Sequence, residues 1–541
     1  MNGKSLIQKV FQLNKVDRIP WVPFVGCHGG SLIGKNADEY LKSADHIVAG
    51  INEAIKLYRP DGIPVMFDLQ IEAEALGCKL NWAKNSPPAV SSHPLIEGKI
   101  KLSDLKIPGK EDGRIGIVME ACKRLRKENP DIALYGLITG PFTLALHLLG
   151  TDIFMQMFEN ESHVHQILEF TKEVGIFMAN EYIENGCDVI AMVDPMTSQI
   201  SPEQFNQFIH KPASGIFDFI RSKDSLSSFF VCGYAQQNIE EMCLCKPDNI
   251  SIDENIPLDY VKEVALKNRI SFAGNMKLTI VLLMGSQEDC QAHALECMEF
   301  GGTEGFILAP GCDLPYDTPT QNLESVTQLV YDPYQQEVIK ALERKEEKVI
   351  LPNMSDYGRA DKVMIDIITL DSESCAPCQY MVEAVKHVTS DFEGIVEWRE
   401  HAIREMESVT FMSALMVKNL PTICIDGKIA FVSKIPPRNE LIAAIQKRIN
   451  QKLRLKIKQK KAEILLVGNS QNECDELNQV VKRSMDELGI QLAVKRVTER
   501  NEIDGLGISR TPAIMIVDYK LKSQGEIPSA DVVKEWIKQV T

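Results

Sequence analysis

Two short apolar runs each end beside a cysteine and a glycine, a pattern that places a thiol at the end of a strand. One covers residues 229–233 and contains Cys232, and the other covers residues 306–312 and ends at Cys312. In a chain of alternating strands and helices, the carboxyl ends of parallel strands converge on one face, which would bring these two thiols together. Two thiols at such a place suit a soft metal such as zinc. The alternative is a pair of buried structural cysteines, since free cysteine is among the most buried residue types.

The composition limits the class of protein. A length of 541 residues predicts about three or four domains, and 44% hydrophobic with 25% charged residues is typical of a globular protein. The formal net charge of −16 argues against a surface for nucleic acid or for an anionic membrane. The amino-terminal residues lack the pattern of a secretory signal, and the 14 cysteines mostly lack paired spacing. We therefore expect a cytoplasmic protein in a reducing compartment, without nucleic-acid or membrane partners.

Short apolar runs alternate with amphipathic stretches over roughly the first 340 residues. About eight such units are typical of an α/β fold of the (β/α)8, TIM-type barrel class. The expected strands cover residues 61–68, 133–138, 187–194, 229–233, 249–254, 270–275 and 306–312.

Several of these strands end in polar or reactive groups, at the face where a barrel keeps its chemistry. Asp194, Asp253 and Asn275 are the candidates for catalytic residues that line the pocket. The alternative is structural, because carboxylates and amides after a strand commonly cap the next helix.

Five segments of the barrel resemble the uroporphyrinogen decarboxylase superfamily, in particular its corrinoid-dependent methyltransferase branch. They are residues 194–201, 231–233, 251–254, 274–278 and 308–312. In that branch, a His-x-Cys element and a distant cysteine bind zinc, which turns a thiol substrate into a thiolate nucleophile. Metal-bound sulfur is deprotonated at neutral pH, and a thiolate is the form that attacks a methyl group.

The resemblance implies that Cys232 and Cys312 are the two thiolate ligands of zinc, but the family histidine is replaced by Phe230. His28 is the candidate for the third ligand; Cys27, Asp194, Asp253 and Glu254 are alternatives by their position at strand ends. The arginine-rich amino-terminal motif of true decarboxylases is missing, which disfavours porphyrinogen decarboxylation. The sequence also lacks the Asp-x-His-x-x-Gly element of corrinoid carriers. The cobamide is therefore expected on a separate corrinoid carrier protein or free in solution.

A strand over residues 362–370 leads into Cys375-Ala376-Pro377-Cys378 and an amphipathic helix. A Cys-x-x-Cys between a strand and a helix is a redox motif, because the amino end of the helix stabilises the thiolate of the first cysteine. Residues 419–428, with Pro421, resemble the cis-proline strand and hairpin of thioredoxins and glutaredoxins.

The pattern repeats over residues 463–525, with a second proline hairpin around Pro512. Its motif has Gln471 in place of the first cysteine and keeps only Cys474, so it cannot form an internal disulfide. We interpret this copy as a structural part, a docking surface or a single-thiol partner of the first.

The sequence thus predicts a barrel over residues 1–345 and thioredoxin-like domains over 346–450 and 462–541. The leading hypothesis is a cobamide-dependent methyltransferase that acts on a thiol or another small methylated or methyl-accepting molecule at a zinc–thiolate site. The attached thiol–disulfide module would keep the site reduced, reactivate an oxidised corrinoid or supply Cys375 as a thiol substrate. The alternative is a thiol–disulfide oxidoreductase or redox sensor whose barrel is a non-catalytic scaffold.

Overall fold

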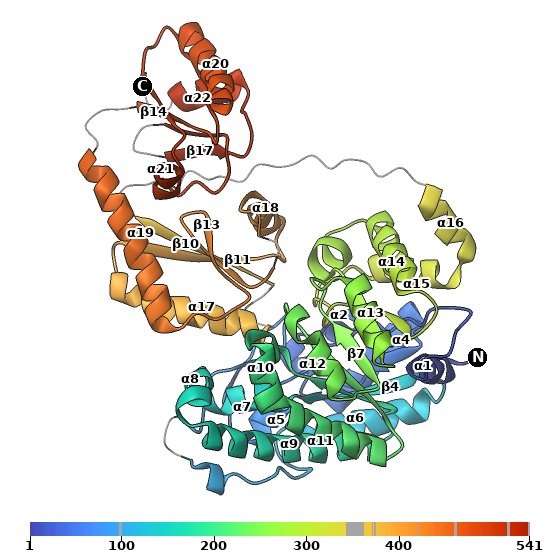
Figure 1. Ribbon diagram of the computed structural model, residues 1–541. Helices are drawn as coiled ribbons and strands as arrows, with labels where there is room; N and C mark the ends of the chain where they lie inside the picture. Colours follow the sequence, from blue (N-terminus) through green and yellow to red (C-terminus); the bar gives the residue numbers. More distant parts are fainter. Residues whose placement is uncertain are drawn as a thin grey trace. The chain divides into compact units, whose positions relative to one another are not determined.

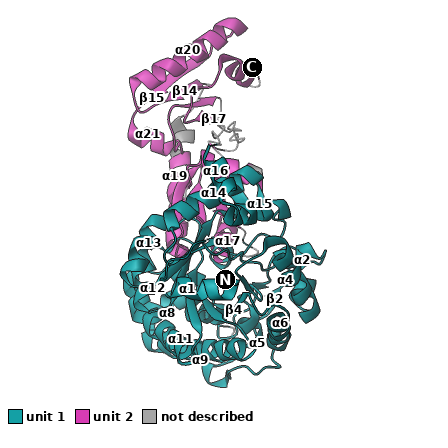
Figure 2. Ribbon diagram, turned by 90° about the vertical axis from the view of Figure 1, so that its right-hand side faces the viewer, with its two compact units in different colours: residues 1–346, 371–379 teal, residues 347–370, 380–541 magenta. Residues whose placement is uncertain are grey.

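The computed structural model divides the chain into two compact units, which Figure 2 shows in different colours. One consists of Met1–Glu346 with Asp371–Gln379, and the other of Glu347–Leu370 with Tyr380–Thr541. Residues 1–96, 100–341, 357, 362–370, 372, 375–417, 419–458, 463–516 and 520–538 are described here. The predicted boundaries at residues 345 and 346 lie outside the described residues.

The first unit is built on one parallel sheet of seven strands, in the order β1-β4-β5-β6-β7-β8-β9. Figure 1 shows helices of this unit around the sheet, of which β4 and β7 are labelled. Nearly every strand residue is buried, as expected where helices cover a parallel sheet. The strands are β1 (Gly62–Pro64), β4 (Ala133–Thr139), β5 (Val189–Val193), β6 (Leu226–Val231), β7 (Asn249–Ile252), β8 (Ser271–Met276) and β9 (Phe306–Pro310).

A single residue occupies the eighth position of the ring. Trp21 forms a parallel bridge with Leu308 of β9, and on its other side its carbonyl accepts the N–H of Asp61 at 2.9 Å. Pro20 and Pro23 flank this bridge and lack an N–H, so the pairing cannot extend into a full strand. The predicted (β/α)8 barrel is confirmed, with a minimal eighth strand.

The outer helices follow the strands along the chain, as in other barrels of this class. The longest of them are α4 (Ala44–Tyr58), α6 (Ile115–Glu128), α9 (Glu161–Glu184), α11 (His210–Ser222), α13 (Leu258–Lys267), α14 (Gln287–Gly301) and α15 (Thr320–Tyr331). Shorter ones are α7 (Pro141–Leu149) and α12 (Ile239–Leu244), and α16 (Pro333–Ala341) ends the described part of the barrel.

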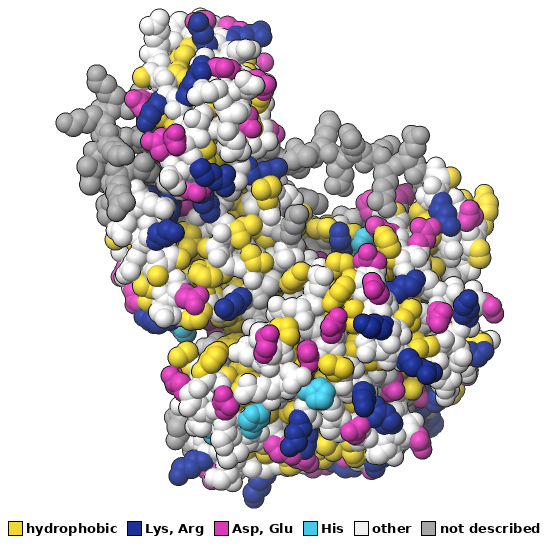
Figure 3. Space-filling model, in the orientation of Figure 1, with side chains coloured by type: hydrophobic (Ala, Val, Ile, Leu, Met, Phe, Trp, Pro, Cys, Tyr) yellow, Lys and Arg dark blue, Asp and Glu magenta, His cyan; other side chains and the backbone are white. Residues whose placement is uncertain are grey.

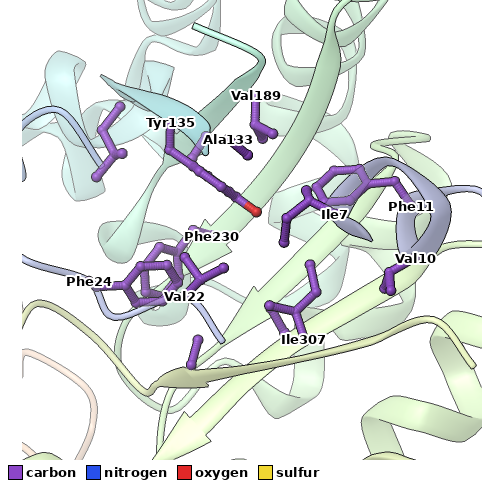
Figure 4. Packing of buried hydrophobic residues seen from close by; sticks show 14 of the residues in the cluster. Ile7, Val10, Phe11, Val22, Phe24, Ala133, Tyr135, Val189, Phe230 and Ile307 are labelled. Carbon is purple, nitrogen blue, oxygen red and sulfur yellow. The ribbon is translucent and has the colours of Figure 1, made fainter. Parts of the chain in front are cut away.

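Apolar side chains fill the barrel interior, so it is a packed core (Figure 4). The apolar face of α1 (Gly3–Phe11) contributes Ile7, Val10 and Phe11 to this cluster. Further along the barrel axis the cluster contains Phe230 and then Cys232, two residues on, which share one face of β6 because side chains alternate along a strand. The core thus reaches the reactive end of the barrel.

The second unit contains two four-stranded sheets of identical connectivity, β11-β10-β12-β13 and β15-β14-β16-β17. In each, the first two strands along the chain pair in parallel and the last two pair antiparallel. This repeat confirms two thioredoxin-like folds. The first has β10 (Val363–Thr369), β11 (Val396–Ala402), β12 (Thr422–Ile425), β13 (Lys428–Val432), α17 (Ala376–Thr389), α18 (Met406–Ala414) and α19 (Arg438–Lys458), and the start of α17, up to Gln379, groups with the first unit. The second has β14 (Glu463–Val467), β15 (Ala493–Val497), β16 (Ala513–Ile516), β17 (Lys520–Gln524), α20 (Gln471–Leu488), α21 (Arg500–Gly505) and α22 (Ala530–Lys538).

The two thioredoxin-like folds share a core within the second unit. One cluster of buried side chains takes residues from both, including Phe411 from the first and Leu465 from the second. Arg448 of α19 is buried between them: its Nε donates to Asp426 at 2.7 Å, and its Nη1 donates to the carbonyl of Gly505. Burying a guanidinium this way is tolerable because its charge is paired.

Over the described part of the chain, no helix is both long and apolar enough to cross a membrane. The stretch of the sequence that most resembles a membrane span forms strand β4 and the buried helix α7 of the first unit. On the face shown in Figure 3, acidic and basic side chains are interspersed and do not gather by sign.

Candidate functional site

The structure brings the two predicted thiols together at the carboxyl ends of two barrel strands. Cys232 directly follows β6 and Cys312 lies two residues beyond the end of β9, and their side chains hydrogen-bond with each other. Cys232 is 6% exposed, whereas Cys312 is partly exposed. Cys312 is therefore the thiol that an incoming molecule meets first.

A glycine makes this approach possible. A Cβ on Gly311 would lie 2.5 Å from the backbone nitrogen of Glu254, which follows β7. No side chain fits in that space, so only glycine lets the segment before Cys312 run against the end of β7.

The two thiols have different proton affinities. The hydrogen bond with Cys312 and burial both raise the pKa of Cys232 well above its ordinary value. For Cys312, the hydrogen bond with Cys232 favours the thiolate, but burial and the carboxylates of Asp313 and Asp253 outweigh it, so its pKa is also raised. Without a further positive charge, both sulfurs hold their protons at neutral pH.

Three aromatic rings belong to the same buried cluster as Cys232, and Cys312 packs against this cluster. Phe230 packs against Phe24 with ring centroids 5.1 Å apart and against Phe67 at 5.8 Å, and Figure 4 shows the first of these contacts. Phe230 is the residue that replaces the histidine of the His-x-Cys element, and it offers no metal ligand. The position has become part of an apolar floor.

His28 was predicted as the third zinc ligand, and the structure gives its ring other partners. Its Nε2 lies 2.6 Å from the hydroxyl of Tyr58, and its Nδ1 lies 3.0 Å from the carbonyl of Tyr316. Burial lowers the pKa of His28 to about 4, so the ring is neutral at neutral pH. With both nitrogens occupied, His28 behaves as a satisfied core histidine, and its role as a ligand stays without support.

The donor set around the thiols does not fit the zinc site of the methyltransferase branch. In the described parts of the chain, no group of three or more histidine, cysteine, aspartate or glutamate side chains is placed to hold a metal ion. Catalytic zinc is ordinarily held by three protein ligands. Cys232 and Cys312 supply two.

Asp253 positions the segment that carries Cys232. Its carboxylate accepts the backbone N–H of Gly233 at 2.8 Å and the backbone N–H of Asn255 at 2.9 Å. Gly233 has φ +88, a left-handed conformation that favours glycine. Burial raises the pKa of Asp253 against the effect of these hydrogen bonds. The carboxylate thus fixes the turn directly after the thiol.

Asn275, the second predicted pocket residue, joins neighbouring strand ends. Its side-chain amide donates to the carbonyl of Asp253 at 3.1 Å and to that of Ile256 at 2.7 Å. Both amide hydrogens of Asn275 are therefore used within the protein. This geometry supports a positioning role.

Asp194 caps the helix that follows the neighbouring strand. Its carboxylate accepts the N–H of Phe142 at 3.0 Å, and it accepts the N–H and the hydroxyl of Thr143 at 2.8 and 2.6 Å. Burial raises the pKa of Asp194 to about 6 against these hydrogen bonds. The structural alternative considered for Asp194 matches this geometry, and a catalytic role stays a prediction.

Sequence reasoning missed two buried charged residues of the barrel, of which Asp313 lies beside the thiols. Asp313 directly follows Cys312, and a Cβ on Gly26 would lie 2.4 Å from its carboxylate. Arg114, at the start of α6, is buried and pairs with Asp68 at 2.5 Å and with Glu74 at 2.6 Å. The position of Asp68 after an expected strand could have marked it as a candidate. Arg114 precedes a helix in a stretch without a motif, so nothing in the sequence pointed to it.

The predicted redox motif lies at the amino end of a helix, and its redox role stays a prediction. Cys375 precedes α17, and its backbone carbonyl accepts the N–H of Gln379 at 2.9 Å. Cys375 is partly exposed and Cys378 is buried, as expected for an attacking and a resolving thiol. The Leu420–Pro421 and Thr511–Pro512 peptide bonds are cis, as the hairpin pattern predicts.

Cys474 is buried on the first turn of α20, and its thiol lies 3.6 Å from the carbonyl of Leu466. Ser470 caps this helix in place of a reactive turn. Of the three interpretations of the second copy, this arrangement supports the structural one.

Comparison with known proteins agrees with the barrel and with the second thioredoxin-like fold. Residues 2–332 match the model of the uroporphyrinogen decarboxylase (URO-D) family, and residues 462–538 match that of a thioredoxin domain. The methylcobamide:CoM methyltransferase MtaA of Methanosarcina barkeri is 31% identical over 284 residues, which are 50% of this chain and 81% of that protein. The uroporphyrinogen decarboxylase of Trichodesmium erythraeum is 24% identical over 277 residues, 49% of this chain and 76% of that protein.

A solved structure described as a methyltransferase from Methanosarcina mazei matches with a TM-score of 0.56 and 26% identity. The match covers 61% of this chain and 98% of that one. The family match takes in more than half of the chain and includes both thiols and every strand of the barrel. The chain belongs to the uroporphyrinogen decarboxylase family, and its barrel is similar to methyltransferases of that family.

Proposed function

We propose that this protein transfers a methyl group between a corrinoid cobalt and a small thiol or another small substrate at the Cys232–Cys312 pair. The observation that carries the proposal is the meeting of these two thiols at the reactive end of the barrel. The similarity to methylcobamide:CoM methyltransferases supports it, because the names of those relatives give this reaction class.

In this proposal, each residue at the site has a role that follows from its position. Cys312 is the more exposed thiol and would face the incoming substrate, Cys232 hydrogen-bonds to Cys312, and Asp253 holds the turn that follows Cys232. Phe24, Phe67 and Phe230 form an apolar floor in the buried cluster that also contains Cys232. A dry, fixed site favours a methyl transfer, since it spares the reacting sulfur from losing a hydration shell in the reaction.

The cobamide and its carrier belong to this proposal. Because the sequence lacks the Asp-x-His-x-x-Gly element, the corrinoid would arrive on a separate carrier protein or free in solution. Zinc remains a prediction that the donor set does not fit, so no step of the proposed reaction depends on it.

The test is the visible spectrum of methylcob(III)alamin mixed with the reduced full-length protein and a panel of small thiols. We expect a thiol-dependent loss of the methylcobalamin band, abolished by Cys312→Ser. Cys290→Ser is the matched control, because Cys290 is a buried barrel cysteine in α14 whose thiol bonds to the carbonyl of Val281. An unchanged spectrum with every thiol, with a corrinoid carrier present, would refute the proposal.

A second function is favoured by one observation, the loss of the family histidine to Phe230. In this alternative the barrel is a scaffold, and the chain is a thiol–disulfide oxidoreductase or redox sensor that acts through Cys375 and Cys378. A zinc content below about 0.1 per chain that Cys312→Ser leaves unchanged, together with no methyl transfer, would support it.

A further inference from the structure

The segment that carries the Cys-x-x-Cys motif groups with the barrel. Asp371–Gln379 belongs to the same compact unit as Met1–Glu346. Within this unit, the side chain of Gln379 donates to the carbonyl of Val90 in β3 (Ala89–Val90) at 2.9 Å. The turn that carries Cys375 thus belongs to the same unit as Cys232 and Cys312.

An electrostatic observation points to the same place. The charge of Cys375 is among the influences that raise the pKa of Cys232, together with those of Cys312 and Asp253. Cys375 therefore lies within electrostatic range of Cys232 in the same unit.

Cys232 and Cys312 also have the properties of a redox pair. Their thiols are close enough to hydrogen-bond, and both are in the reduced form in this structure. Phe230 removes the third ligand that would hold these sulfurs on a metal. A thiol pair that no metal protects is open to oxidation to a disulfide by peroxides or small disulfides, and methyl transfer at this site would then stop.

We propose that Cys375 and Cys378 reduce a Cys232–Cys312 disulfide within the same chain, which makes the thioredoxin-like module a built-in reductase of the barrel site. The proposal rests on the proposed function only in that both use the same two thiols.

The exchange is balanced in two steps. The Cys375 thiolate attacks the partly exposed Sγ of Cys312, so that a Cys375–Cys312 bond forms, the Cys232–Cys312 bond breaks and Cys232 leaves as a thiolate that takes up a proton. Cys378 then loses its proton and attacks Cys375; the Cys375–Cys378 disulfide forms, and Cys312 leaves as a thiolate. Two electrons pass to the barrel pair, and an external dithiol afterwards reduces Cys375–Cys378.

The test traps the intermediate. Full-length Cys378→Ser protein is oxidised with a small disulfide and digested without reduction, and the joined peptides are identified by mass spectrometry. We expect a peptide pair that joins Cys375 to Cys312, at a yield independent of protein concentration. The pair should be absent after Cys375→Ser and unchanged by Cys474→Ser, the control for a buried thiol of the second module. Cys375 found only with the small thiol, or joined to a second chain, would overturn the proposal.

A second measurement leaves Cys378 in place. The rate at which a dithiol restores the Cys232–Cys312 thiols should be at least ~10-fold higher in the wild type than in Cys375→Ser, because the tethered thiol acts at a high effective concentration. Equal rates would overturn the inference. Methyl transfer by pre-reduced Cys375→Ser protein reports on the proposed function alone, so that the two ideas fail separately.

Discussion

Two neighbouring regions at the reactive end of the barrel use the same kind of position in opposite ways. At the ends of β6 and β9, Cys232 and Cys312 bond to each other, and one of them is open to an incoming molecule. At the end of β5, the carboxylate of Asp194 is buried and bonded to the residues that begin α7. A polar residue after a barrel strand is thus a reactive group only where its atoms are not already used by the protein.

The largest effect on methyl transfer should come from substitution of a thiol. Cys312→Ser should lower methyl transfer from methylcobalamin by about 100-fold or more, since it removes the sulfur that the substrate meets. The unfolding temperature should stay close to that of the wild type, because Cys312 lies partly exposed beyond the core. Loss of the methylcobalamin band and thermal unfolding measure the two effects. Equal activity of Cys312→Ser and wild type would remove the thiol pair from the reaction.

A substitution on the floor would sharpen the distinction between a metal site and a thiol pair. Phe230→His restores the His-x-Cys spacing on the inner face of β6 and should raise bound zinc by roughly 10-fold, because three donors then replace two. Phe229→His is the matched control, since Phe229 packs against Phe217 of α11 on the other face of the strand. Zinc per chain is measured by elemental analysis after dialysis. A similar rise in both variants would mean that the gain does not come from the site.

Asp253 is intermediate between a reactive group and a structural cap. Its carboxylate bonds to the backbone, and this bond fixes the turn after Cys232. Asp253→Asn should lower methyl transfer by roughly 10-fold, as expected when a group that orients a reactive residue is weakened. Asp259→Asn, at an exposed aspartate on α13, should leave the rate unchanged. A larger loss in Asp253→Asn than in Cys312→Ser would point to a direct role of this carboxylate in the reaction.

The smallest effect on methyl transfer should come from substitution of the Asp194 carboxylate. Asp194→Asn should change methyl transfer by less than about 2-fold, as expected for a helix cap. A loss as large as that of Cys312→Ser would restore Asp194 to the catalytic residues.

The same variant has a distinct effect on stability. Burial raises the pKa of Asp194 from 3.8 to about 6, so the folded state binds this proton more tightly than the unfolded state. The free energy of unfolding should therefore fall by up to ~3 kcal/mol from this group as the pH rises from about 4 to about 6. Asp194→Asn should remove that component, and Asp152→Asn, at an exposed residue of α8 (Asp152–Glu159), should retain it. Denaturant titrations at several pH values give the comparison.

Local patterns allowed most of the fold to be predicted. The strand, Cys-x-x-Cys and helix of the first thioredoxin-like module lie next to one another in sequence, and the repeat gave the second module. The pairing of Cys232 with Cys312 followed from strand-end logic and the family resemblance. The partners of single side chains could not be predicted. Phe230 packs against rings from separate segments of the chain, and Asp194, after β5, accepts a hydrogen bond from Thr143 of α7. Such contacts depend on register and packing, which one sequence does not encode in a readable pattern.

The single bridge at Trp21 closes the ring of strands weakly. We call residues 20–23, where few backbone hydrogen bonds are possible, the seam of the barrel. Between Pro20 and Pro23 only two amides are available for the ladder, whereas β4 and β5 pair along five residues. Local opening follows the stretches with the fewest backbone hydrogen bonds, so hydrogen exchange should be fastest at this seam among the barrel strands. Gly26, whose backbone faces Asp313, follows it by a few residues. Breathing of the amino-terminal strand is therefore the motion best placed to change the surroundings of Cys312.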